Sequence, residues 1–474
     1  MNKNLFLPVF LSSCLIGIGS AFAQNDGDSS DIRPLPKSLF VQLDGGQVEA
    51  GPAKSAILNR FSAWYTDQIL IQDRLDVRGG VGGLFWYSYN PGGLPSGAGY
   101  ENVTNFGPGL SEVDATYKFG DLNHSPAFLQ MGYFPYKYNP DAMDLGEYLL
   151  RSQAYPNVLV TGNGDGWDYM SEANYMMLGF RFNLSLWDGK FRSDFMLHME
   201  RDNAPEGDLS PTYVATLDPL PGIEIGVGAD CSHCISVDPS KTTPKAAPSP
   251  NQQGNAYIEQ NPNWTPADTL PGSPPRYVDT LPNGKAAGYY TFEGLKLEAR
   301  ASFDPKAYIP LPMLGKEDLK IFGEVAVLGV KDYPFYYTDI YQRMPIMFGI
   351  NIPTFKLLDI LSFQMEYFNS KFLNTNWNLI EYGTSVPIPE GVTADGVATD
   401  DPNQMIPDTR AIEAQKWHWA VYAKRQVIKG VSIYAQVACD HLRIPIYDGS
   451  FTNQEVTDGN GSNWYYLMRL EFGI

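Results

Sequence analysis

The 474-residue chain has little cysteine, little histidine and no excess of positive charge. It contains four cysteines and five histidines, and 53 acidic residues outnumber 34 basic ones to give a net charge of −19. Binding to nucleic acid phosphates needs a basic surface, so nucleic acid is excluded as a partner. An apolar fraction of 43% with 13% aromatic residues also excludes an intrinsically disordered chain.

Long apolar runs are also missing, except near the N-terminus, which excludes a protein that crosses a membrane with several helices. Lys3 precedes the apolar residues 5–19, and the small–x–small pattern at 21–23 fits a cleavage site. Residues 1–23 are therefore predicted to be a secretory signal peptide. A retained N-terminal anchor and a lipoprotein cleaved before Cys14 remain as alternatives. Cleavage would remove Lys3 and change the net charge from −19 to −20.

From about residue 38 onwards, apolar side chains recur at every second position and not at helical spacing. Phe180 and Phe182, for example, alternate with Arg181 and Asn183, which predicts a strand with one apolar face. The same alternation recurs over 191–200, 295–303, 361–367 and 416–424. Both a soluble β-sandwich and a membrane barrel would show this alternation.

Two features favour the membrane barrel. Aromatic residues gather at predicted strand ends, as in Trp64-Tyr65 and Trp464-Tyr465, where interfacial girdles occur. Long and short connections also alternate, as they do at the two ends of an outer-membrane barrel. We predict an all-β fold, a single antiparallel transmembrane β-barrel of about 16 strands over residues 24–474. Its long loops are expected at 89–110, 137–172, 231–287, 369–412 and 444–461; the connection 304–318 is longer than a periplasmic turn should be.

The remaining cysteines suggest one disulfide. Cys231 and Cys234 form a C-x-x-C motif, and in an exported protein oxidation to a local disulfide is expected. Zinc binding with His233 is the alternative, although no second cysteine or histidine pair has a suitable spacing. Cys439 shares an apolar strand face and is expected to be a free thiol facing lipid.

The last strand shows a resemblance to a known class. Residues 464–474 place Trp464, Tyr466, Met468, Leu470, Phe472 and Ile474 on one face. This segment resembles the terminal strand of bacterial outer-membrane β-barrel proteins, which the barrel-assembly machinery recognises; their usual final residue is Phe, whereas this chain ends in Ile. The layout resembles the sixteen-stranded porins, whose third external loop folds into the lumen. The resemblance implies the outer membrane of a Gram-negative cell, with membrane lipid and small hydrophilic solutes as partners, and leaves a homotrimer open.

By this count, residues 137–172 are the third external loop. Asn139 as N-cap and Pro140 at the first position predict a helix through Arg151. The acids of this segment either stabilise the helix or form one side of a pore constriction that prefers cations. The predicted constriction consists of Asp141, Asp144 and Glu147, facing the wall residues Arg181, Arg192, Lys296 and Arg300.

Other functions are weaker alternatives. His198 shares a strand face with Asp194 and Glu200, but no serine lies in an elbow motif, so we expect no catalytic residue and no enzyme. Residues 163–168 resemble part of a calcium loop without its final bidentate Glu, so neither a metal nor a cofactor is expected. Loop aromatics such as Trp264 leave open a carbohydrate-binding, adhesion or sugar-uptake barrel. Passive diffusion of small hydrophilic solutes or ions is the preferred function.

Overall fold

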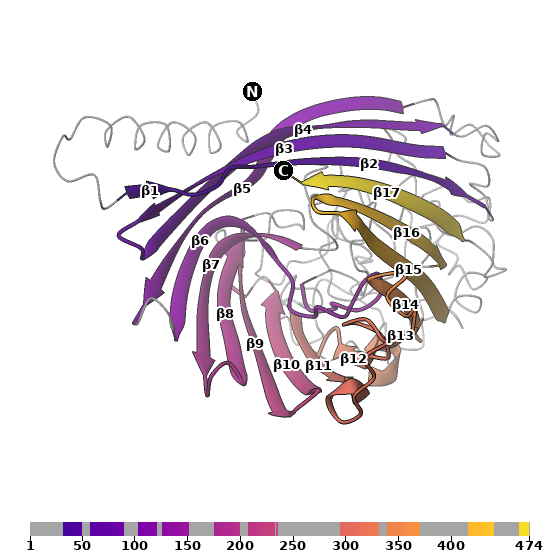
Figure 1. The fold of residues 1–474 in the computed structure, drawn as a ribbon. Helices are drawn as coiled ribbons and strands as arrows, with labels where there is room; N and C mark the ends of the chain where they lie inside the picture. The colour runs from indigo at the N-terminus through magenta and orange to yellow at the C-terminus, as the bar shows by residue number, and fades with distance from the viewer. Residues whose placement is uncertain are drawn as a thin grey trace, which may run out of the picture.

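The structure is a computed structural model. It describes residues 32–49, 57–89, 103–120, 126–150, 175–199, 207–232, 234–235, 294–330, 339–369, 416–439 and 464–473. Sixteen consecutive strands, β2 to β17, pair with their neighbours in antiparallel fashion, and β17 pairs with β2, so that the sheet closes into a ring (Figure 1). The predicted antiparallel barrel of about 16 strands is therefore confirmed.

The ring includes several strands long enough to cross a bilayer when tilted. A short extra strand, β1 (Ile32–Pro34), pairs with the end of β3. The sixteen ring strands are β2 (Ser38–Val48), β3 (Ile57–Ile71), β4 (Leu75–Tyr89), β5 (Val103–Phe119), β6 (Ala127–Tyr136), β7 (Tyr175–Leu186), β8 (Phe191–Met199), β9 (Leu209–Leu220), β10 (Ile223–Ser232), β11 (Gly294–Phe303), β12 (Ile321–Val327), β13 (Ile346–Asn351), β14 (Ile360–Tyr367), β15 (Trp417–Ile428), β16 (Val431–Cys439) and β17 (Tyr465–Gly473).

Helix is scarce in the described part of the chain, which contains two short 3-10 segments, η4 (Pro305–Ala307) and η5 (Ile340–Arg343). Within the described ranges, no helix has both the length and the apolar character needed to cross a membrane.

The two faces of the ring have opposite polarity. On β11, Leu295 and Leu297 point outward and are 38% and 40% exposed, whereas Lys296 and Arg300 point inward and are buried. The same alternation places Phe180 outward on β7. An apolar exterior suits lipid, and a polar interior suits water or polar protein groups.

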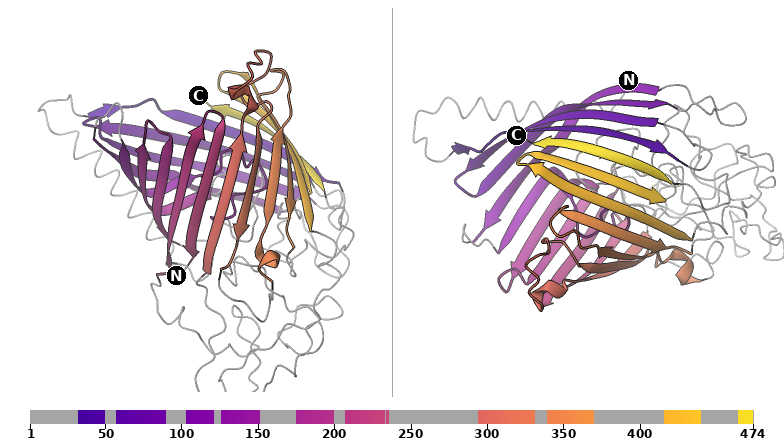
Figure 2. Two further views of the ribbon diagram at one scale, coloured as in Figure 1. Left: turned by 90° about the horizontal axis from the view of Figure 1, so that it is seen from below. Right: turned by 45° about the vertical axis from the view of Figure 1, so that its right-hand side comes forward.

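Short turns between neighbouring strands lie at one end of the ring, as Figure 2 shows. At this end, turns of two to four residues join β3 to β4, β7 to β8, β9 to β10 and β15 to β16. Asp188, Gly222 and Gly430 adopt positive φ in these turns, the backbone form that tight hairpins need. The predicted loop 89–110 is too long, because β5 begins at Val103 and residues 103–110 are strand. Much of the other long loops lies outside the described residues.

Three of the four cysteines lie within the described residues. Cys231 and Cys234 are joined by a disulfide at the end of β10. Cys439, at the end of β16 opposite Trp419 on β15, forms no disulfide within the described residues. Its side chain is buried, so its predicted exposure to lipid is wrong.

A buried ion pair joins the first and last strands of the ring. Arg469 of β17 is the register partner of Asp44 of β2, and the Arg469 Nε lies 2.7 Å from the Asp44 Oδ1. The two side chains are 2% and 1% exposed. Gln42 donates a hydrogen bond to the second carboxylate oxygen of Asp44 at 2.7 Å. A slip of β17 by one residue against β2 would turn Arg469 to the outer face and leave Asp44 buried without this cation, so the pair fixes the register of closure.

Arg469→Met should lower the free energy of unfolding by about 3–5 kcal/mol, because it leaves the Asp44 carboxylate buried without its cation. The measurement is the temperature at which the folded band converts to the unfolded band on a detergent gel. Arg33→Met is the matched control, because Arg33 pairs with Asp73 at the surface, where an ion pair contributes at most about 1 kcal/mol. Equal losses in the two variants would contradict this account of closure.

Candidate functional site

The chain between β6 and β7 turns into the barrel. Residues 137–150, which we call the lumenal segment, leave the end of β6 and run inside the ring of strands (Figure 1). The segment reaches β12 and β14, and β14 lies eight strands from β6 in either direction around the ring. From residue 144 to residue 150, every side chain of the segment is buried. The lumenal segment therefore crosses the interior and contacts the far wall.

Glu324 of β12 is the main contact of the segment with this wall. Its Oε1 accepts hydrogen bonds from the Tyr138 hydroxyl at 2.6 Å and from the Tyr148 N–H at 3.0 Å. Its Oε2 accepts from the Asn139 side-chain amide at 2.5 Å and from the Glu147 N–H at 2.9 Å. Glu147 in turn accepts a hydrogen bond from the Asn139 N–H at 2.7 Å. One wall carboxylate thus holds both ends of a bend in the segment.

Gln364 of β14 provides a second contact. Its Oε1 accepts from the backbone N–H groups of Asp144 and Leu145 at 3.0 and 2.9 Å. Its Nε2 donates to the carbonyl oxygen of Asp141 at 3.2 Å. A single amide side chain therefore satisfies three backbone groups that would otherwise be buried without partners.

Two further wall residues hold the end of the segment. The Tyr148 hydroxyl donates to Glu366 of β14 at 2.7 Å, and the other oxygen of Glu366 lies 2.8 Å from His418 Nδ1 of β15. Lys296 of β11 donates to the Leu149 carbonyl oxygen at 3.1 Å. The polar contacts of the segment therefore extend over wall strands β11, β12 and β14.

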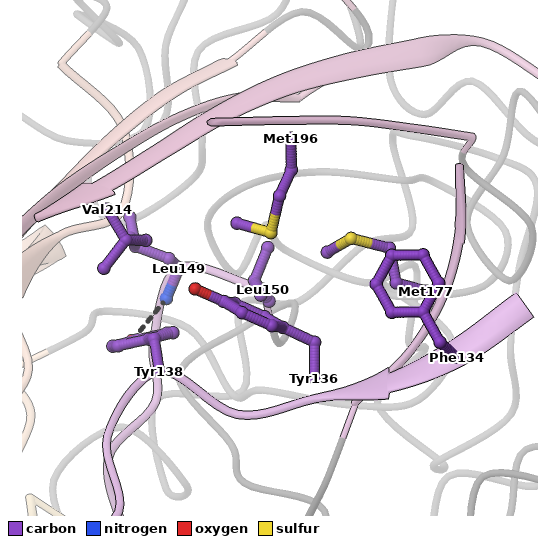
Figure 3. Close-up of a cluster of buried hydrophobic side chains, with 8 residues drawn as sticks. All are labelled: Phe134, Tyr136, Tyr138, Leu149, Leu150, Met177, Met196 and Val214. Carbon is purple, nitrogen blue, oxygen red and sulfur yellow. Dashed lines mark hydrogen bonds between the residues drawn. The ribbon is translucent and has the colours of Figure 1, made fainter. Parts of the chain in front are cut away.

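The opposite side of the segment is held by apolar packing (Figure 3). Leu149 and Leu150 are buried among apolar side chains of β6 to β9. These wall side chains are Phe134, Tyr136, Met177, Met196 and Val214. Met177 and Met196 occupy inward strand positions that are elsewhere polar. This part of the wall therefore packs against the lumenal segment and does not contact water.

The helix predicted over 139–151 does not form in its described part, residues 139–150. The backbone N–H groups that a helix would pair internally are instead bound by Gln364 and Glu324. Gly146 and Glu147 have φ values of +98° and +61°, which a right-handed helix cannot contain. The prediction failed because side chains distant in sequence compete for the segment's backbone.

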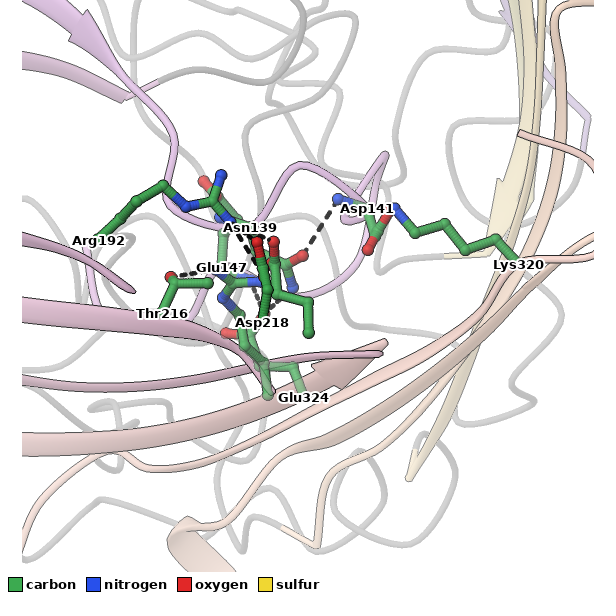
Figure 4. Close-up of polar contacts among 10 residues, drawn as sticks. Asn139, Asp141, Glu147, Arg192, Thr216, Asp218, Lys320 and Glu324 are labelled. Atoms are coloured by element: carbon green, nitrogen blue, oxygen red, sulfur yellow. Dashed lines mark hydrogen bonds and ion pairs between the residues drawn. The ribbon is translucent and has the colours of Figure 1, made fainter. Parts of the chain in front are cut away.

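The three predicted acids of the constriction all lie in the lumenal segment and are buried. Asp141 pairs with Lys320, with 2.5 Å between the Asp141 Oδ1 and the Lys320 Nζ (Figure 4). Burial raises the pKa of the Asp141 carboxyl, and Lys320 opposes that rise. Asp144 and Glu147 are fully buried beside the wall strands β14 and β12. Lys320, which precedes β12, was not among the predicted residues.

Of the four predicted wall cations, Lys296 is the one that contacts the lumenal segment within the described residues. Lys296 also lies 3.7 Å from a carboxylate oxygen of Asp230 on β10. Arg181 binds Asp194 with two hydrogen bonds of 2.8 and 3.1 Å. Its guanidinium also lies 4.8 Å from the centre of the Tyr136 ring. The structure therefore brings Lys296 to the segment and keeps Arg181 within the wall.

The other two arginines share a carboxylate. Arg192 lies 2.7 Å and Arg300 lies 2.5 Å from the two oxygens of Glu224. Gly226 allows this arrangement, because a Cβ at that position would lie 2.6 Å from the Arg300 Nε. Arg300 is the register partner of Glu324 but reaches across Gly226 to Glu224, so Glu324 keeps both oxygens for the lumenal segment.

His198, the histidine considered as a candidate base, has other partners than the carboxylates expected beside it. His198 Nε2 lies 3.0 Å from Thr212 Oγ1 and 3.4 Å from Asp230 Oδ1. Asp194, the carboxylate expected beside it, binds Arg181 instead. Glu200 lies outside the described residues.

Sequence reasoning missed the residues that receive the lumenal segment, Glu324, Gln364 and Glu366. Nothing in their strand pattern separates them from other inward polar residues. A signal did exist on the opposite side, where Met177 and Met196 interrupt otherwise polar strand faces. Two apolar residues facing a lumen indicate that protein covers them there.

The chain is similar to several solved structures, at low sequence identity. No family model and no curated protein matches the chain. Matching solved structures include a mutant of the Rh. blastica porin, with 8% identity over 94% of this chain and 100% of that chain and a TM-score of 0.39. They also include Salmonella typhi OmpF in complex with daunomycin, with 8% identity over 93% and 97% of the two chains and a TM-score of 0.42. The high-pH structure of Pseudomonas putida OprB gives 11% identity over 94% of both chains and a TM-score of 0.47.

With identities this low and TM-scores below 0.5, these likenesses say nothing about solute or mechanism. The strand pairing itself establishes the fold. The chain is a closed, antiparallel barrel of sixteen strands, with a class-level resemblance to porins.

Proposed function

We propose that the protein is an outer-membrane channel for passive diffusion of small hydrophilic solutes or ions, narrowed by the lumenal segment. One observation carries the proposal: residues 137–150 cross the interior of a closed barrel and are bound on both sides by its wall. A segment fixed in this way reduces the cross-section of a pore. The polar inward faces of the strands suit hydrated solutes, which would lose ordered water against an apolar wall.

The constriction consists of Asp141, Asp144 and Glu147 on the segment, with Lys320 added from the structure. Arg181, Arg192, Lys296 and Arg300 provide the positive side of the wall. All four of these cations pair with wall carboxylates: Arg181 with Asp194, Lys296 with Asp230, and the other two arginines with Glu224. The local field near the segment is therefore set by its own acids, by Lys320 and by the wall carboxylates that contact it, Glu324 and Glu366.

The cellular setting belongs to the same proposal. The apolar outer face of the ring lies in the outer membrane, and β17 is the segment that the barrel-assembly machinery recognises. A homotrimer is the proposed assembly, to be tested by the mass of the detergent-extracted protein.

In a planar bilayer, the purified protein should give stepwise ion conductance, because solutes pass the constriction without a moving part. The native protein should also be recovered with outer-membrane fractions. A barrel that only binds carbohydrate would remain closed to ions. Absence of conductance from a folded, reconstituted sample would overturn the channel proposal.

Opposite substitutions of the Asp141–Lys320 pair should shift ion selectivity in opposite directions. Asp141→Asn leaves the lysine charge unpaired and should move the reversal potential in a salt gradient toward anion preference. Lys320→Met leaves the carboxylate and should move it toward cation preference. A fixed charge on an external loop is screened within about 8 Å at physiological salt, whereas a charge in a narrow, low-dielectric lumen is screened less.

The matched control neutralises Asp400 and Asp401, which belong to the predicted external loop 369–412 outside the described residues. That control should shift the reversal potential far less than the triple change Asp141→Asn, Asp144→Asn and Glu147→Gln. Equal shifts from the two sets would show that the lumenal segment does not control selectivity.

Glu324→Gln should release the lumenal segment and so raise both the conductance and the current noise of single channels. The change removes a charged acceptor of four hydrogen bonds, each contributing about 1.5–3 kcal/mol, and adds an amide donor facing other donors. Asp194→Asn is the control, because Asp194 is a wall carboxylate whose hydrogen bonds come from wall residues. If both variants kept wild-type conductance, Glu324 would not anchor the segment.

A further inference from the structure

The end of the ring that carries the short turns also bears an apolar projection. It consists of residues 304–320, between β11 and β12, and residues 352–359, between β13 and β14, which we together call the turn knob. Figure 2 shows it standing beyond the strand ends, at the end of the barrel where the C-terminus lies. With seventeen residues, its longer part far exceeds the turns of two to four residues that join β3 to β4, β7 to β8, β9 to β10 and β15 to β16 at this end.

The two parts of the knob are bonded into one unit. Lys356 Nζ donates to the Pro312 carbonyl oxygen at 2.8 Å. The Thr354 N–H and hydroxyl both lie 3.3 Å from Asp318 Oδ1, and Asp318 is 1% exposed. The knob is therefore packed protein with a fixed surface.

That surface is strongly apolar. Residues 307–315 contain no charged side chain. Ile352 is 40% exposed, and the most exposed large side chains are Tyr308 at 52%, Ile309 at 56%, Met313 at 61%, Phe355 at 59% and Leu357 at 76%. Five such side chains on one rigid unit mark an interaction surface, since isolated apolar residues would not be gathered in this way.

The knob continues the outward apolar face of the strands beside it. The Tyr308 ring lies 6.1 Å, between centroids, from the ring of Phe303, the last outward residue of β11. Ile321 of β12 and Phe348 of β13 are exposed on the same outer surface. The lipid or water that contacts this outer face of the barrel therefore also contacts the turn knob.

The strands at the knob are also short. β12, β13 and β14 contain seven, six and eight residues. At about 3.3 Å per residue and a tilt of about 40°, such strands rise about 15–20 Å, less than an apolar band of about 25 Å. The apolar side chains of the knob extend the apolar outer surface beyond the ends of these short strands. Lys316, which follows the uncharged run, is 96% exposed and can reach phosphate groups.

We propose that the turn knob inserts into the adjoining phospholipid leaflet, with its five most exposed apolar side chains among acyl chains and Lys316 at the phosphate level. The inference rests on the proposed function, because it requires the barrel to lie in a membrane. The partner of the knob is a lipid leaflet and not a periplasmic protein. The knob completes the apolar band around the outside of the barrel, and lipid covers that band on every side.

The test uses nitroxide labels on the full mature chain, reconstituted in vesicles of phosphatidylcholine and phosphatidylglycerol. Cys439→Ser provides the background, since Cys231 and Cys234 are paired. The measured quantity is the ratio of label relaxation by oxygen, which concentrates in lipid, to relaxation by a water-soluble nickel chelate. This ratio should be several-fold higher for labels at Met313→Cys and Leu357→Cys than for a label at Gln72→Cys. Gln72 is the control because it lies exposed in the short turn between β3 and β4 at the same end.

A label at Phe348→Cys separates the inference from the function on which it rests. If the Phe348 label meets lipid while the two knob labels meet the nickel chelate, the knob lies in water and the inference is overturned alone. If the Phe348 label also meets the chelate, the barrel does not lie in the membrane and both proposals fail. If neither reagent reaches the knob labels, protein covers the knob and the lipid assignment is overturned.

Discussion

Every other feature of this molecule depends on the need to pair all backbone N–H and C=O groups where no water can reach them. An open sheet in lipid would leave two edges unpaired, at a cost of several kcal/mol for each group. Closure by β17 against β2 removes both edges. Once the ring is closed, every residue belongs to an outer or an inner face, and the alternation of polarity follows from that division. The interior then becomes a polar space in which a chain segment can be held by side chains.

In the lumenal segment, side chains and not neighbouring strands provide the hydrogen-bond partners that a buried backbone needs. Its backbone forms neither helix nor strand, so its N–H groups need other acceptors in a buried place. Glu324 and Gln364 supply them, and Gly226 keeps Arg300 directed toward Glu224 and away from Glu324. The position of the lumenal segment thus depends on a wall glycine that does not itself contact the segment's acids. It also depends on apolar residues such as Met177, which close the opposite side.

The fold was accessible from the sequence because a period of two is a local property. Pairs such as Leu297 and Lys296 reveal their faces without any knowledge of neighbouring strands. The site was less accessible, because its contacts join residues far apart in the chain. Asn139 and Pro140 predict a helix after β6, which does not form over residues 139–150 because the segment's backbone bonds to distant side chains and not to itself. The pairing of Arg300 with Glu224, or of Asp141 with Lys320, depends on strand order and depth and is not written in any local pattern.

The separation in sequence between the lumenal segment and its anchors has a consequence for how the barrel is made. Asn139 and Glu324 are 185 residues apart, and Asp144 and Gln364 are 220 apart. Until β12 and β14 are in place, the backbone of the segment lacks these acceptors, and bringing such distant partners together carries a large entropic cost. The apolar contacts with β6 to β9 involve partners nearer in sequence and can form earlier. Assembly therefore has a natural order, in which the segment first settles on the wall of the N-terminal half and is locked only when the C-terminal half completes the ring.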